Sequence, residues 1–106
     1  MATVEERRWM SAIVRLGCIV CHLQGYPGTP AEVHHILSGG RRRGHLFTLP
    51  LCSPGHHRNG DGPGVKKISR HPWKLRFEAA YGNEEALLAK TRQLVADLEG
   101  RTRRAA

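Results

Sequence analysis

The chain has 106 residues, and its 17 Lys and Arg against 9 Asp and Glu give a net charge of +8. This length predicts one domain and excludes a two-domain organisation. Only 40% of the residues are hydrophobic and 6% aromatic, so a further stabilising device such as a bound metal is expected. The positive charge favours a polyanionic partner, with nucleic acid the first candidate.

The sequence contains nothing close to the roughly 18 consecutive apolar residues that a membrane span needs. Residues 1–8 are charged and do not resemble a signal peptide. We therefore expect a cytoplasmic protein with no membrane partner and no small-molecule cofactor. Its three cysteines cannot all pair within one chain, which favours metal ligation over a disulfide framework.

The first predicted element is a helix over 4–16. Thr3 and Glu6 have the spacing of a capping box, and Gly17 supplies the end signal. Cys18 and Cys21 follow as a metal-binding knuckle, and a loop rich in glycine and proline covers 25–30.

A β-hairpin is predicted next, with strands over 32–37 and 45–51 and a glycine-rich turn over 39–44. Ser53 and Pro54 suit the start of a helix that carries His56 and His57. Glycines over 60–64 would end this helix. The segment therefore predicts a compact ββα unit.

Two helices are predicted after this unit. The first opens near Ser69 and Pro72 and ends at Gly82, and the second covers 84–99 and ends at Gly100. The expected fold is a single α+β domain over 1–100, a ββα core with flanking helices, followed by a disordered basic tail over 101–106.

Four residues are candidate ligands of a structural zinc ion: Cys18, Cys21, Cys52 and His56. A closed tetrahedral site needs four nitrogen or sulfur ligands, and two short chelating pairs would tie the first helix to the ββα unit. The alternative interpretation is that the cysteines are small buried hydrophobic residues. His22, beside Cys21, is a less favoured substitute ligand.

A second group consists of histidines: His34, His35, His57 and His71. Adjacent residues on a strand point to opposite faces, so His34 and His35 are expected to divide their work. One would bind a metal ion, and the other would act as a base, since neutral imidazole suits both tasks.

These segments resemble a known family. The run Glu32-Val-His-His-Ile followed by Leu49-Pro-Leu-Cys-Ser-Pro-Gly-His-His-Arg is similar to the HNH, or ββα-metal, endonuclease superfamily. With Gly40-Arg-Arg-Arg-Gly-His and the run from Arg76 to Gly82, the chain is most similar to phage RecA-dependent nucleases of the Ref type. The resemblance covers roughly residues 17 to 95 and implies a metal-dependent DNA endonuclease, directed by RecA filaments and working in a host cytoplasm if a phage encodes it.

The resemblance also implies residue roles. His34 and His57 would bind the catalytic divalent ion, which would be Mg²⁺ or Mn²⁺, with Zn²⁺ as an alternative. His35 would be the general base. His71 is the favoured third ligand, with Asp61 as its rival.

Two departures from the family pattern leave alternatives open. Three residues rather than two separate Cys52 from His56, so His56 and His57 could exchange their roles. The central Asn of the HNH pattern, which orients the base, has no counterpart, and His45 or Thr48 occupies that neighbourhood.

Basic residues surround these histidines and are expected to contact DNA phosphates, giving salt-sensitive, sequence-independent affinity. They are Arg41, Arg42, Arg43, Arg58, Lys66, Lys67, Arg70, Lys74 and Arg76. The alternative function is a zinc-containing DNA-binding module without catalysis, in which the second histidine group would have no role.

Overall fold

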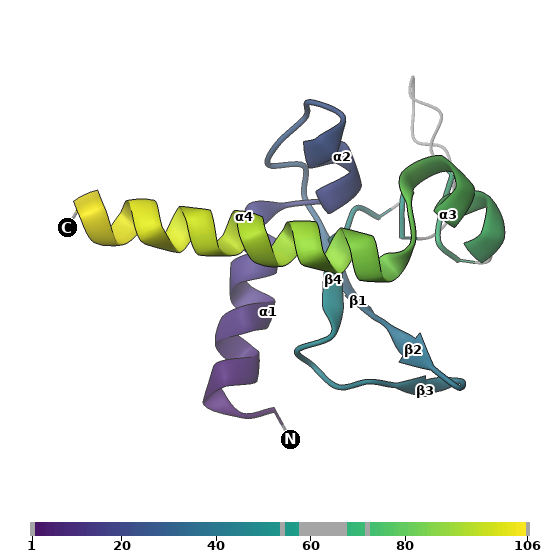
Figure 1. The fold of residues 1–106 in the computed structure, drawn as a ribbon, viewed down its shortest axis with the longest axis horizontal. Coiled ribbons are helices and arrows are strands. Elements are labelled where there is room, and N and C mark those ends of the chain that lie inside the picture. The colour runs from purple at the N-terminus through teal and green to yellow at the C-terminus, as the bar shows by residue number, and fades with distance from the viewer. Residues whose placement is uncertain (1, 54, 58–67, 72, 106) are drawn as a thin grey trace.

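Four helices surround two small two-stranded sheets in the computed structural model, which describes residues 2–53, 55–57, 68–71 and 73–105 (Figure 1). The elements are α1 (Val4–Leu16), α2 (Ile19–Leu23), β1 (Glu32–His35), β2 (Leu37–Ser38), β3 (Arg41–Arg42), β4 (Thr48–Leu51), α3 (Lys74–Tyr81) and α4 (Glu84–Ala105). The predicted α+β class is confirmed.

The prediction for α1 is confirmed, including its capping box. The Thr3 Oγ1 atom accepts from the Glu6 backbone N–H at 3.0 Å, and Glu6 Oε1 accepts from the Thr3 N–H at 2.8 Å. Gly17 ends the helix with φ at 89°, and a Cβ atom there would lie 2.8 Å from the Thr29 carbonyl oxygen. Only glycine allows this close approach, which leads directly into the cysteine knuckle.

The predicted hairpin pairing is confirmed, but its bounds differ, because residues 41–42 of the predicted turn form a strand and the predicted strand over 45–51 begins only at Thr48. Antiparallel β1 and β4 pair His34 with Leu49 and His35 with Thr48. Beyond them β2 and β3 form a second antiparallel pair around the tight turn at Gly39 and Gly40. His34 is 1% exposed and His35 is half-buried, in line with the opposite faces expected of neighbours on a strand.

The helix predicted to begin at Ser53 is wrong for the described part of that segment, which forms turns and a bridge. The His57 N–H donates to the Cys52 carbonyl at 3.0 Å, and the Arg70 and His71 N–H groups donate to the carbonyls of His56 and His57 at 2.7 and 3.0 Å. The carbonyl groups of His56 and His57, which would accept hydrogen bonds from later residues in a helix, accept instead from Arg70 and His71. Residues 54 and 58–67 lie outside the described residues, so the helical part of a ββα unit does not appear among those described.

The two C-terminal helices are found, with shifted bounds. α3 begins at Lys74, after the predicted opening, and ends before Gly82 as expected. The Asn83 side chain caps α4 by accepting from the Ala86 N–H at 2.8 Å. α4 continues through Gly100 to Ala105, so the predicted end at Gly100 is wrong, and residues 101–105, expected as a disordered tail, continue the helix. A glycine inside a helix costs only about 1 kcal/mol, too little to end it alone.

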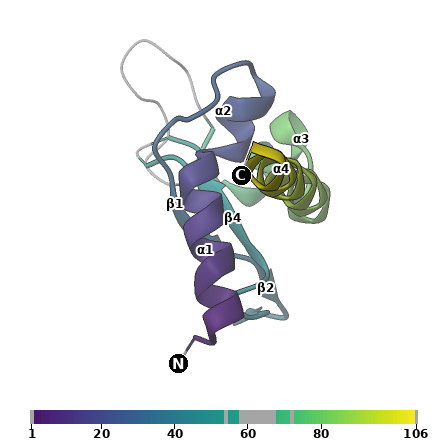
Figure 2. The same ribbon diagram turned by 90° about the vertical axis from the view of Figure 1, so that its left-hand side faces the viewer.

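α4 crosses the molecule as one long rod, with α2 above it and α1 and the strands below it in Figure 1, and Figure 2 shows α1, α2, β1 and β4 to the same side of this helix. The larger core cluster joins the cysteine knuckle, β4 and Phe77 to the start of α4, and a smaller one joins Ile13 and Leu16 of α1 to Val95. Among the described residues, no helix is both long and apolar enough to cross a membrane.

Candidate metal centres

The four predicted zinc ligands come together in one buried cluster. Cys18 is the N-cap residue of α2 and Cys21 lies in its first turn, while Cys52 and His56 follow β4. The His56 Nδ1 atom lies 3.4, 3.4 and 3.3 Å from the sulfur atoms of Cys18, Cys21 and Cys52. The Cys21 and Cys52 sulfur atoms are 3.8 Å apart.

These separations fit the edges of a zinc tetrahedron. Zn–S bonds of about 2.3 Å and Zn–N bonds of about 2.0 to 2.1 Å would separate two sulfur ligands by about 3.8 Å and sulfur from nitrogen by about 3.5 Å. Backbone N–H groups of Cys21 and His56 point at the sulfur atoms of Cys18 and Cys52, at 3.5 and 3.4 Å. The donor set therefore fits a closed, four-coordinate zinc site of the structural kind, to which His56 belongs and His22 does not.

The thiols in this cluster have opposite pKa shifts. Interaction with Cys52, together with burial, raises the pKa of Cys18, whereas interaction with Cys18 lowers the pKa of Cys52. These directions describe a protonated Cys18 beside a Cys52 thiolate, and zinc binding would displace the remaining proton, since thiolate is the form that binds the ion.

His34, His57 and His71 form a second cluster. Their ring centroids are 5.0, 5.2 and 5.1 Å apart, and each offers a nitrogen atom within 4.8 Å of the other two. His34 and His57 are buried, whereas His71 is exposed. The cluster therefore offers three candidate ligands and one side open to solvent, where a bound ion would keep open coordination positions. Asp61, the predicted rival of His71, lies outside the described residues.

A carboxylate holds each of the two buried histidines. The Glu84 Oε2 atom accepts from His34 Nε2 at 2.5 Å, and Glu32 Oε1 accepts from His57 Nδ1. In each ring the carboxylate contacts one nitrogen, and the other nitrogen would be the one to bind a metal ion. Carboxylates placed in this way fix the orientation of ligating histidines and raise their basicity.

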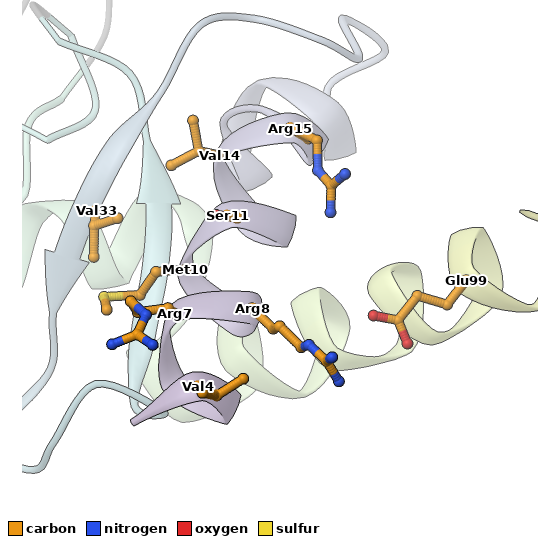
Figure 3. Close-up of a pocket in the computed structure, with 9 residues that line it drawn as sticks. All are labelled: Val4, Arg7, Arg8, Met10, Ser11, Val14, Arg15, Val33 and Glu99. Carbon is orange, nitrogen blue, oxygen red and sulfur yellow. The ribbon is translucent and has the colours of Figure 1, made fainter. Parts of the chain in front are cut away.

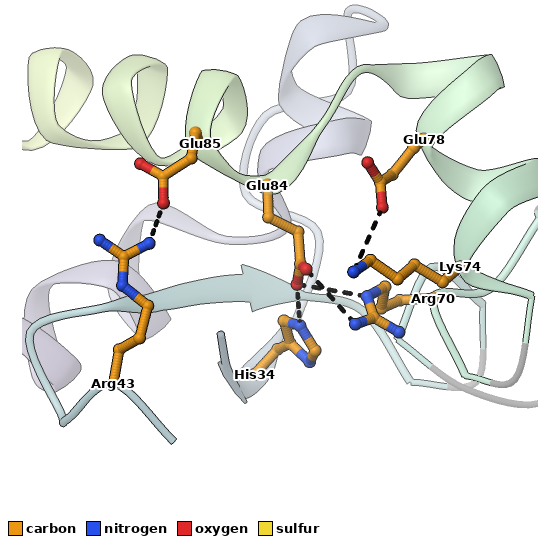
Figure 4. A network of polar contacts seen from close by, with 7 residues as sticks. All are labelled: His34, Arg43, Arg70, Lys74, Glu78, Glu84 and Glu85. Atoms are coloured by element: carbon orange, nitrogen blue, oxygen red, sulfur yellow. Dashed lines mark hydrogen bonds and ion pairs between the residues drawn. The ribbon is translucent and has the colours of Figure 1, made fainter. Parts of the chain in front are cut away.

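Arg70 holds Glu84 from its other side (Figure 4). Its Nε atom lies 3.2 Å from Glu84 Oε2, and its NH2 group lies 3.3 Å from Oε1. Burial raises the pKa of Glu84, but the hydrogen bonds from His34 and Arg70 together lower it by more, so the net shift of the pKa is downward. Arg70 is 7% exposed, and its charge faces this carboxylate.

The predicted base, His35, lies beside the second cluster. Its Nε2 atom is 3.0 Å from His45 Nδ1. Burial lowers the pKa of His35, and the positive charge of Arg42 adds to this shift. The His45 carbonyl in turn accepts from the Thr48 hydroxyl at 2.9 Å, and that hydroxyl accepts from the Trp9 indole N–H at 2.9 Å.

A pocket of about 200 Å³ joins the histidine cluster to His35, and Arg42 of β3 lines its edge. Arg41 and Arg42 are exposed. Arg43 instead pairs with Glu85 and stacks on Phe47, with its guanidinium carbon 4.2 Å from the ring centroid. Lys74 pairs with Glu78 (Figure 4). Arg58, Lys66 and Lys67 lie outside the described residues.

Sequence reasoning missed Glu32 and Glu84 as members of the site. Glu32 has the appearance of an ordinary strand residue, and Glu84 that of an acidic residue favoured in the first turn of any helix. Their partners are 25 and 50 residues away along the chain, so local patterns carry no signal for them.

The chain is similar to a known family of nucleases. Residues 2–96 match the family described as recombination enhancement, RecA-dependent nuclease. The matched range includes every residue of both clusters and the two carboxylates that hold the buried histidines.

Proposed function

Because the chain belongs to the family of recombination-enhancing, RecA-dependent nucleases, we propose that it is a metal-dependent DNA endonuclease of the HNH type. It would hydrolyse phosphodiester bonds with one divalent ion and a histidine base. The observation that carries the proposal is the open cluster of His34, His57 and His71 beside His35.

His35 is the proposed catalytic residue. In the tautomer that suits this role its Nε2–H group would donate to His45 Nδ1, and its Nδ1 atom would accept a proton from the attacking water. The lowered pKa keeps this imidazole neutral at pH 7, the form a base requires. His45, held by Thr48, is the proposed counterpart of the asparagine that orients the base in other HNH enzymes.

His34, His57 and His71 are the proposed ligands of the catalytic ion, with Mg²⁺ or Mn²⁺ favoured and Zn²⁺ as an alternative. Once bound, such an ion would supply Lewis-acid stabilisation of the phosphate and of the leaving 3′-oxygen. Glu84 and Glu32 orient two of these ligands. Arg70, which the sequence suggested as a DNA contact, is better assigned to positioning Glu84.

The remaining assignments follow from charge and from the family. Arg41 and Arg42 are proposed to contact phosphates at the mouth of the pocket, and Arg58, Lys66 and Lys67 keep the same proposed role. The family description supports dependence on a RecA filament that presents the DNA. A DNA substrate of this kind implies action in the cytoplasm.

The test is cleavage of DNA with Mg²⁺ or Mn²⁺, with and without RecA filaments. Wild-type protein should cut, and His35→Ala should lose about 10²- to 10⁴-fold in rate, as expected for loss of a general base. Zinc content and melting temperature should match those of Ser38→Ala, an exposed change on the adjoining strand.

Two results would contradict the proposal. One is full cleavage by His35→Ala. The other is wild-type protein that binds DNA but never cuts it under any of these conditions, which would support a zinc-containing binding module without catalysis.

A further inference from the structure

A second hollow, about 1040 Å³ in volume, extends along α1, with Val33 of β1 on one side of the helix and Glu99 of α4 on the other (Figure 3). Its apolar lining comes from Val4, Met10 and Val14 of α1 and from Val33 of β1. Val4 is 58% exposed and Val14 is 43% exposed. We call this hollow the α1 groove. Exposed apolar side chains gathered in one depression are typical of an interaction site.

The rim of the α1 groove is basic. Arg7, Arg8 and Arg15 line it, against one acidic residue, Glu99. Arg8 and Arg15 are two helical turns apart on one face of α1, and their guanidinium groups point toward α4 (Figure 3). Within the described residues neither forms an ion pair. The groove thus carries an excess of positive charge next to an apolar surface.

The Glu99 end of the α1 groove is remote from the histidine centre, although Val33 lines both hollows. Glu84, which holds His34, and Glu99, which lines the groove, lie on the same helix. At about 1.5 Å per residue, 15 residues of α4 separate them by about 22 Å. A molecule bound between α1 and Glu99 would therefore leave the histidine cluster open to DNA.

We propose that the α1 groove binds an acidic protein segment that also carries apolar side chains, and that this segment belongs to the recombinase filament. The charge of the rim complements acidic side chains. The valines and Met10 offer apolar surface, and its burial gives favourable free energy when the partner groups are also apolar. A sugar-phosphate backbone would satisfy the arginines but leave this apolar surface uncovered. Identification of the partner as the recombinase rests on the proposed function.

The groove also touches the strand that carries the site. Val33 lines both the α1 groove and the pocket beside the histidines, and it directly precedes His34. Contact between the recombinase and this groove would therefore include Val33 of β1. Binding would hold the enzyme on the filament and would also contact the strand that carries His34 and His35.

The test compares three variants in binding to RecA filaments formed on single-stranded DNA with a non-hydrolysable ATP analogue. Arg15→Glu removes a rim charge, Val14→Ser removes apolar surface without a charge change, and Lys90→Glu is the control. Lys90 is an exposed cation on α4 that does not line the groove, so it matches the charge change of Arg15→Glu.

Co-sedimentation should weaken tenfold or more for Arg15→Glu and about fivefold for Val14→Ser, and less than twofold for Lys90→Glu. Binding of all the variants to naked DNA should agree within about twofold. The proposal is overturned if wild-type protein does not bind filaments or if both groove variants bind them normally. It also fails if Arg15→Glu weakens naked DNA binding equally while Val14→Ser has no effect, since the groove would then be a nucleic-acid surface.

Cleavage is measured separately on the same samples. Wild-type protein that binds filaments through the groove but never cuts DNA would contradict the proposed nuclease function alone. Normal cutting with no filament binding would contradict the groove proposal and leave the nuclease activity standing.

Discussion

The two clusters differ in how completely protein surrounds them, although adjacent residues, His56 and His57, contribute to them. The cysteine cluster is fully buried, and its four donor atoms lie at the separations of a zinc tetrahedron. The histidine cluster has three donors, one of them exposed, and opens into a pocket. A closed set of ligands suits a structural ion and an open set suits chemistry on a bound substrate.

The groups behind the ligands differ in the same sense. Backbone N–H groups stabilise the sulfur atoms of Cys18 and Cys52, which fixes the fold around them. Carboxylates stabilise His34 and His57, which sets the direction and basicity of each ring. Loss of a residue from the cysteine cluster should therefore unfold the protein, whereas loss of a residue from the histidine cluster should impair ion binding and catalysis.

The largest expected effect is on the cysteine cluster. Cys52→Ser should release the zinc and lower the free energy of unfolding by several kcal/mol, because small metal domains gain much of their folding energy from the ion. Zinc stoichiometry by mass spectrometry and thermal unfolding would measure this. A variant that keeps one tightly bound zinc per chain and unfolds like wild type would contradict the structural role given to the cysteine cluster.

Glu84→Gln should weaken divalent-ion binding at the histidine cluster by about 10- to 100-fold, since it removes the carboxylate behind His34. Calorimetric titration with Mn²⁺ on zinc-loaded protein would measure the change. Glu85→Gln, at the neighbouring exposed position that pairs with Arg43, is the control and should bind Mn²⁺ like wild type. Equal affinity in the two variants would contradict the role given to Glu84.

The pH dependence of cleavage should follow His35. A general base works when neutral, and burial lowers the pKa of His35 below the ordinary 6.5. Activity should therefore persist below pH 6.5 and then fall about tenfold per pH unit as the imidazole becomes protonated. Arg42→Ala removes a nearby positive charge, so it should shift the midpoint upward in pH–rate profiles. An unchanged midpoint in this variant would contradict the assignment.

The smallest effect separates two neighbouring arginines. Arg42→Ala should weaken DNA binding by a few-fold and reduce the salt slope by about 1, as expected for one lost phosphate contact. Arg43→Ala should change the slope less, because its guanidinium group already pairs with Glu85 and stacks on Phe47. Fluorescence anisotropy over a range of salt concentrations would measure both slopes. A larger change in Arg43→Ala would reverse the assignment.

The sequence predicted what depends on short spacing. The capping box of α1, the hairpin pairing and the meeting of Cys18 and Cys21 with Cys52 and His56 all follow from local signals or ligand chemistry. Prediction from the sequence failed where residues distant along the chain determine the local structure. Backbone pairing with 70–71 overrides the helix signal at Ser53, and a single glycine at position 100 does not outweigh a long helix.

Glu84 also determines when the site can form during synthesis. Its carboxylate joins His34 of β1 to Arg70, yet it belongs to the first turn of α4. A nascent chain whose last helix is still inside the ribosome has its cysteines, its hairpin and its histidines, but nothing to hold the His34 ring. The His34 ring would therefore reach its final arrangement only after α4 has emerged, later than the four residues of the cysteine cluster.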